Sequence, residues 1–174
     1  MSRAVIVDVE TTGLDPAVDH VWEIAVISVY AGHVDRWSML VDHDAGLAGR
    51  LPVRYFDQHN EACAAGPVMP VDVVRSMIHA SFVPDEHGSV PTLVGACPWF
   101  DAAFLRKLVG GELWHHRLRC VESMTAGHLG RDVGGLSDCL AALDLAPIRE
   151  AHRAAGDADA ALRIWQHLTH QENS

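Results

Sequence analysis

Apolar residues occur at strand and helix spacing along most of the chain. An almost unbroken Val/Ile run at residues 4–9 predicts a strand that is covered on both faces of a sheet. Two further apolar runs, at residues 21–30 and 34–41, are separated by an Ala-Gly-His turn. Together the three runs predict a three-strand meander in the first part of the chain.

The rest of the chain predicts helices that alternate with short strands. Residues 42–70 show no regular spacing, and we interpret them as irregular. The elements expected after them are a helix at residues 71–82, a strand at 92–95, a helix at 98–109 ended by two glycines, a strand near 118–122 and two terminal helices. Strands followed by alternating strands and helices predict an α/β domain.

Composition agrees with one compact domain. The chain has 174 residues, of which 49% are apolar, and this is enough for a single core over residues 1–174. We see no apolar run of membrane-span length and no signal peptide, so we expect a cytosolic protein without a membrane partner. The four cysteines are far apart, and we expect reduced, mostly buried thiols rather than a zinc ribbon or disulfides.

The net charge of −10 limits how the protein can bind nucleic acid. Binding along a broad surface depends on Lys and Arg side chains that displace counterions from phosphates. This acidic chain is therefore unsuited to such a surface. Any contact with nucleic acid must be local.

Two carboxylates follow the first apolar run. Strand side chains alternate between faces, so Asp8 and Glu10 project from one side while the valines at positions 5, 7 and 9 pack on the other. Two like charges this close on a buried strand are costly unless cations neutralise them. Mg²⁺ and Mn²⁺ accept such oxygen ligands. The pair predicts a metal site, and the alternative is two solvated acids at the end of a strand.

A third carboxylate, Asp101, falls in the first turn of a helix that begins at Pro98. Leu105 and Leu108 follow at i+4 and i+7, so Asp101 belongs to the face that points inward. The helix N-terminus contributes only about 0.3–1 kcal/mol, which does not offset the burial of a charge. A bound metal would offset it. The alternative is an acid at a partly exposed helix start.

The last candidate pair is His152 and Asp157, in the segment His-Arg-Ala-Ala-Gly-Asp. This segment leads into an apolar-faced final helix, whose start we predict at Gly156 and Asp157. Taken alone, a His-x4-Asp pair is more often two surface residues than a functional pair.

In order and spacing, Asp8, Glu10, Asp101, His152 and Asp157 resemble the DEDDh family of 3′-to-5′ exonucleases. Val-Asp-Val-Glu-Thr-Thr-Gly-Leu is similar to the first motif of that family, Phe-Asp-Ala-Ala-Phe-Leu to the second and His-Arg-Ala-Ala-Gly-Asp-Ala-Asp to the third. The resemblance spans nearly the whole chain. It implies a ribonuclease-H-like fold, with a five-stranded mixed sheet, its first three strands antiparallel, and flanking helices.

The resemblance also implies a chemistry. The four acids would hold two Mg²⁺ or Mn²⁺ ions about 3.5–4 Å apart. Asp8 would bridge the ions, Glu10 and Asp157 would complete the metal on the side of the attacking water, and Asp101 would assist at the other. His152 would take the proton from the water, as a side chain that titrates near neutral pH can.

Further residues would contact the substrate, a single-stranded 3′ end of DNA or RNA. The positions that the resemblance assigns to the strand end are Thr11, Thr12, Gly13 and Leu14. Trp99 and Phe100 could stack on bases, which contributes about 1–3 kcal/mol per base, although Phe100 is equally explained by core packing. One residue departs from the family pattern, because Cys97 stands where many members have Asn, and a thiol cannot replace the hydrogen bonds of an amide.

Other interpretations stay open at this point. A haloacid-dehalogenase-type phosphatase also begins with a strand and Asp-x-Asp, but here the second acid is Glu10 and the one lysine, Lys107, is poorly placed. A ribonuclease-H-like module that binds nucleic acid or a polymerase without cleavage is a second alternative. A polymerase partner is also compatible with a proofreading exonuclease. We interpret His115-His116 and Asp42-His43-Asp44 as solvated loop residues.

Overall fold

One mixed sheet forms the centre of the computed structural model, which describes residues 3–149 and 152–170. Its strand order is β4-β3-β2-β1-β5-β6. The strands are β1 (Ala4–Thr11), β2 (Val21–Tyr30), β3 (His33–Val41), β4 (Val68–Met69), β5 (Thr92–Gly95) and β6 (Arg119–Cys120). The first three are antiparallel neighbours, whereas β5 runs parallel to β1, β6 to β5 and β4 to β3.

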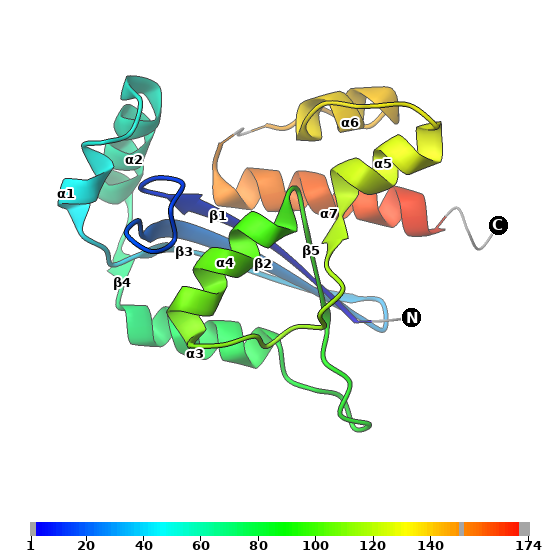
Figure 1. Cartoon of the computed structure of the whole chain (residues 1–174), viewed down its shortest axis with the longest axis horizontal. Helices are drawn as coiled ribbons and strands as arrows, with labels where there is room; N and C mark the ends of the chain where they lie inside the picture. The colour runs from blue at the N-terminus through cyan, green and yellow to red at the C-terminus, as the bar shows by residue number, and fades with distance from the viewer. Residues whose placement is uncertain (1–2, 150–151, 171–174) are drawn as a thin grey trace.

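Helices cover both faces of this sheet (Figure 1). They are α1 (Ala45–Ala48), α2 (Val53–Ala65), α3 (Val71–Ser81), α4 (Pro98–Val109), α5 (Val121–Leu129), α6 (Leu136–Ala142) and α7 (Ala154–His170). α7 packs on β1 and β2 and carries α5 and α6, while α3 and α4 cover the other face. Within residues 3–149 and 152–170, no helix combines the length and hydrophobicity that a membrane span requires.

The α/β prediction with three antiparallel strands is confirmed, and the predicted count of five strands is wrong. The described sheet has six strands, and β4 lies within the stretch at 42–70 that we predicted to be irregular. A strand of two residues, such as β4, is too short to show the alternation that identifies strands in a sequence. It forms because its backbone pairs with the end of β3.

The same stretch contains a 13-residue helix, α2, so its irregular assignment is wrong there as well. The apolar residues of α2 lie mainly at its two ends, six polar or charged residues lie between them and at Arg54, and only His59 and Ala62 are buried. The helix therefore lacks the apolar stripe that predicts a helix.

Smaller differences concern the C-terminal elements. The strand near 118–122 contains only Arg119–Cys120, three helices follow it rather than two, and α7 begins at Ala154 rather than at Gly156. The cysteine prediction is partly wrong: all four cysteines lie in the described part of the chain as free thiols, but only Cys139 is buried.

Alternation along β1 divides the interior into two cores. Ala4 and Ile6 pack against α7 and its neighbours, whereas Val5, Val7 and Val9 pack against α3 and α4. Asp8 and Glu10 continue the even-numbered series, so they share the α7 side of the sheet. The predicted division of faces along this strand is confirmed.

The core beneath α4 should be sensitive to truncation. Leu105 is fully buried, and its replacement in Leu105→Ala removes apolar contacts and leaves a cavity. We expect the free energy of unfolding to fall by about 2–5 kcal/mol in urea denaturation. The control Val53→Ala removes an exposed side chain and should change it by less than about 0.5 kcal/mol. Equal losses in both variants would contradict this packing.

Candidate active site

Three carboxylates meet at the carboxyl end of β1. Oxygen atoms of Asp8, Glu10 and Asp157 all lie within 4.8 Å of one another. Asp8 and Glu10 come from the central strand, and Asp157 comes from the first turn of α7, which packs on β1. The fold therefore joins the first and third sequence motifs.

Asp101 approaches this cluster from the other face of the sheet. It lies in the first turn of α4 and is only 4% exposed, and its Oδ1 accepts a hydrogen bond of 3.1 Å from the backbone N–H of Val9. A glycine at the end of β5 permits this approach, because a Cβ at Gly95 would lie 2.9 Å from the Val7 carbonyl oxygen and 3.5 Å from Asp101 Oδ2. All four predicted acids are thus gathered around the end of β1.

Burial and mutual repulsion change the acidity of this group. Burial raises the pKa of Asp8 well above its ordinary value, and the charges of Asp101, Asp157 and Glu10 raise it further. Burial, followed by the charge of Asp157, raises the pKa of Glu10 to about 8. Burial also raises the pKa of Asp101 to about 7. Negative charge in this cluster is unfavourable without a cation.

The donor set fits divalent metal ions. Carboxylate oxygens are the ligands that Mg²⁺ and Mn²⁺ prefer, and Asp8, Glu10 and Asp157 can each offer one oxygen to a common point. A bound cation would offset both the burial and the mutual repulsion of these carboxylates, which raise their pKa values in that order of size.

His152 lies beside the cluster, just before α7. It adopts a left-handed backbone conformation with φ of 61°, and its backbone N–H donates to Asp157 Oδ2 over 3.2 Å. Its exposed ring makes an edge contact with Tyr55, at 5.4 Å between centroids, and its Nε2 accepts a hydrogen bond of 3.2 Å from Arg54. Both contacts come from α2.

A partly buried ion pair that we did not predict holds the start of α7. Glu23 on β2 is 3% exposed and accepts hydrogen bonds of 2.8 and 2.9 Å from the Arg153 guanidinium. Glu23 also lies directly across from Glu10 in the β1–β2 register. The pair therefore fixes the segment between His152 and Asp157 against the sheet. An acid within the apolar run at residues 21–30 is the sequence signal that could have identified it.

The loop after β1 is tightly folded and presents one apolar side chain to solvent. Thr12 is buried and bonds His20 through both its backbone and its hydroxyl, which closes the loop. A Cβ at Gly13 would lie 2.3 Å from a carboxylate oxygen of Asp19, so only glycine fits there. Leu14 is 83% exposed. The loop thus holds an apolar side chain outward, next to the acids at the end of β1.

Trp99 and Phe100 differ in exposure. Trp99 is 58% exposed at the start of α4, whereas Phe100 is half-buried, and its ring packs against Phe104 at 5.0 Å between centroids. Trp99 is therefore available for base stacking, while Phe100 contributes mainly to the core under α4.

Cys97 caps α4 in the left-handed region, with φ of 41° and ψ of 49°. Its thiol donates to Glu122 Oε2 over 3.5 Å, and burial, followed by the charge of Glu122, raises the pKa of this thiol to about 11. Residues with a Cβ are disfavoured in this backbone region, where Asn is tolerated better. The backbone conformation at position 97 thus favours Asn, the residue that many members of the resembled family have here.

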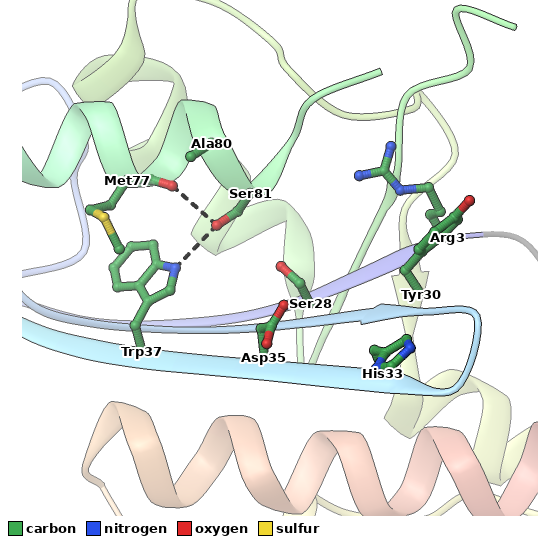
Figure 2. Close-up of a pocket in the computed structure, with 9 residues that line it drawn as sticks. All are labelled: Arg3, Ser28, Tyr30, His33, Asp35, Trp37, Met77, Ala80 and Ser81. Atoms are coloured by element: carbon green, nitrogen blue, oxygen red, sulfur yellow. Dashed lines mark hydrogen bonds between the residues drawn. The ribbon is translucent and has the colours of Figure 1, made fainter. Parts of the chain in front are cut away.

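The other candidate residues lie apart from the acids. Asp42, Asp44 and His116 are exposed, as predicted. The predictions for His43 and His115 are wrong: His43 is half-buried and bonds to His59, and His115 is half-buried with its ring 4.2 Å from that of His116 between centroids. Figure 2 shows a pocket of about 470 Å³ between α3 and the β2–β3 hairpin, at the opposite end of the sheet from the acids. None of the predicted site residues lines it.

Solved structures show what this fold resembles. The chain is similar to E. coli exonuclease I in complex with a dT13 oligonucleotide, at 17% identity and a TM-score of 0.67, over 99% of this chain and 42% of that one. It is also similar to a moderately thermophilic exonuclease I from Methylocaldum szegediense, at 16% identity and a TM-score of 0.68, over 100% of this chain and 42% of that one. No protein-family model and no curated protein matches the sequence.

These similarities establish the class of fold. The chain has the ribonuclease-H-like fold of the exonuclease I structures, which confirms the fold that the motifs implied. It spans about two fifths of the length of those proteins, 42% in both cases.

The stability of the metal-free protein should fall as the pH rises. Because the pKa values of Glu10, about 8, and Asp101, about 7, lie above their ordinary values, the folded protein retains protons that the unfolded chain has lost. We expect the melting temperature in EDTA to fall steadily from about pH 5 to pH 8, and Mn²⁺ to raise it most at the upper end. Glu10→Gln should weaken both effects, and a pH-independent melting temperature would contradict the argument.

The backbone at Cys97 generates a separate prediction. A left-handed conformation costs most residues about 1–2 kcal/mol, and Asn adopts it more readily. We expect Cys97→Asn to raise the free energy of unfolding by up to about 1 kcal/mol in urea denaturation. The matched control Cys97→Ser keeps the size of the thiol and should remain near the wild-type value. A less stable Asn variant would exclude this explanation.

Proposed function

We propose that this chain is a metal-dependent 3′-to-5′ exonuclease that removes nucleotides from single-stranded DNA. The observation that carries the proposal is the gathering of Asp8, Glu10, Asp101 and Asp157 around the end of β1, with His152 beside them. The fold alone would not support it, because one fold serves many functions.

The acids would act as metal ligands. Two Mg²⁺ or Mn²⁺ ions, when bound, would supply the charge that activates water and stabilises the leaving 3′ oxygen. Asp8, Glu10 and Asp157, whose oxygens lie within 4.8 Å of one another, would together hold the ion that activates the water. Asp101 would serve the other ion, and its hydrogen bond from Val9 holds the carboxylate in place.

His152 would accept the proton of the attacking water at Nε2. Arg54 donates to this nitrogen, so Nε2 carries the lone pair that a base requires. Arg54 would exchange this bond for a substrate phosphate, which frees Nε2 when the nucleic acid binds. Glu23 and Arg153 would keep the histidine segment in register with the acids.

The strand end would be held by short-range contacts, as an acidic surface requires. Thr11, Thr12 and Gly13 would place backbone groups against the terminal 3′ hydroxyl. Leu14, 83% exposed, would wedge against the last base, and Trp99 would stack on a neighbouring one. DNA is the first substrate to consider because the similar exonuclease I was solved with dT13.

Other expectations remain predictions. They are a single domain, a cytosolic location, a polymerase partner and activity on RNA. The phosphatase alternative gains no support, because Lys107 donates to the Asp19 carbonyl oxygen in the loop after β1.

The test is cleavage of 5′-labelled single-stranded DNA and RNA of equal sequence, with Mg²⁺, Mn²⁺ or EDTA. We expect a metal-dependent ladder that shortens from the 3′ end, with DNA cleaved faster. Asp8→Ala should abolish it. His152→Ala should lower turnover by about 10²–10⁴-fold without a comparable loss of Mn²⁺ binding.

His116→Ala is the matched control, because His116 is exposed and lies outside the motifs. It should cleave like the wild type. If the folded wild-type protein binds DNA but cleaves neither strand with any metal, the proposal fails and the non-catalytic binding module replaces it.

A further inference from the structure

Three metal-binding side chains converge where α2 packs against the sheet. His43 follows the end of β3, and His59 and Cys63 lie one turn apart on α2. Their ligand atoms all lie within 4.8 Å of one another. The two histidine Nε2 atoms are 2.7 Å apart, and Cys63 Sγ lies 3.7 Å from His59 Nε2. These residues are separate from the acids of the proposed active site.

The second nitrogen of each histidine already has a partner. His43 Nδ1 lies 2.7 Å from the Val41 carbonyl oxygen, which can only accept, so this nitrogen carries the proton. His59 Nδ1 lies 3.1 Å from Asn60 Oδ1 and donates to it in the same way. In neutral rings both Nε2 atoms then carry lone pairs that point at each other. A cation between them turns this repulsion into attraction.

Histidine ligands of metals show the same arrangement of outer partners. A ligating imidazole donates its other N–H to a carbonyl or carboxylate oxygen, which fixes the ring and its tautomer. Ligands at i and i+4 on one helix face, as His59 and Cys63 are, form half of many zinc sites.

The distances and atoms fit zinc. Tetrahedral Zn²⁺, with bonds of about 2.0–2.1 Å to nitrogen and 2.3 Å to sulfur, separates two nitrogens by about 3.3 Å and nitrogen from sulfur by about 3.6 Å. The observed Sγ–Nε2 distance of 3.7 Å agrees. The Nε2–Nε2 distance of 2.7 Å needs to widen by about 0.6 Å, which a shift of His43 in its loop after β3 can provide.

The surroundings are suited to a site that is sealed on one side. His59 is 3% exposed, and the Trp22 ring packs edge-on against it at 5.3 Å between centroids. Trp22 belongs to a small buried cluster with Leu40 and Ala62.

We propose that His43, His59 and Cys63 form a zinc site that fastens α2 to the end of β3. The fourth position would be taken by water, since three protein ligands leave it open. The site is structural and does not depend on the proposed nuclease. The zinc site has one consequence for the proposed nuclease. α2, which the zinc would hold in place, also carries Arg54, Tyr55 and Gln58, and these residues contact His152.

The test measures metal binding in the full chain, expressed without a histidine tag. Zinc content is measured by mass spectrometry, and Co²⁺ is titrated to detect the near-ultraviolet thiolate-to-cobalt band. We expect one zinc in this site of the wild type, together with a cobalt–thiolate band. Both should persist in Asp8→Asn, which removes an active-site ligand but not this site.

Cys63→Ser should abolish the cobalt–thiolate band and lower zinc affinity at least about tenfold. His43→Ala should lower zinc affinity in the same way, and His43 is not in the buried core. Cys97→Ser and His116→Ala are matched controls outside the cluster and should bind like the wild type. Circular dichroism confirms that each variant is folded.

The proposal is overturned if the folded wild type shows no cobalt–thiolate band, or if Cys63→Ser and His43→Ala bind zinc as well as the controls. In that case, His43 and His59 form a metal-free hydrogen-bonded pair. His59 Nε2–H donates to His43 Nε2, and the Asn60 side-chain amide is turned so that its nitrogen faces His59 Nδ1. Zinc that disappears only in Asp8→Asn belongs to the active site and likewise overturns it. None of these readouts requires nuclease activity, so failure of the proposed function is detected separately.

Discussion

Repulsion among carboxylates at the end of β1 is the constraint on which the rest of this structure depends. β1 is a central strand covered on both faces, so the acids that follow its apolar residues lie in a partly desolvated place. Burial and the neighbouring charges raise the pKa of Asp8 and Glu10. Such a cluster lowers the stability of the metal-free state, and under the proposed function a bound divalent cation would offset that cost.

The surrounding elements hold the acids at this distance despite the repulsion. The buried Glu23 and the partly exposed Arg153 form a doubly hydrogen-bonded pair that links β2 to the start of α7. Arg153 also lowers the pKa of Glu10, although burial and the acids outweigh this effect. On the other face, the N–H of Val9 fixes Asp101. These contacts position the acids, while hydrophobic packing of α4 and α7 supplies most of the stability.

Helix α2 connects the proposed chemistry to a second cluster. Its first half contacts His152 through Arg54 and Tyr55, and its second half carries His59 and Cys63. Only two of its residues, His59 and Ala62, are buried, compared with five in α4. A zinc site that fastens α2 to β3 would therefore also help to hold His152 in place.

The sequence by itself determined the central strands, α3, α4 and the grouping of the four acids into motifs. Periodicity and the spacing of Asp8, Glu10, Asp101 and Asp157 are local signals, and they were sufficient for these elements. Only the tertiary structure decided β4, α2, the Glu23–Arg153 pair and the meeting of His43 with His59 and Cys63. These features depend on contacts between residues far apart in the chain. β4 is too short for a periodic signal, α2 has no regular apolar stripe, and the last two features join separate elements.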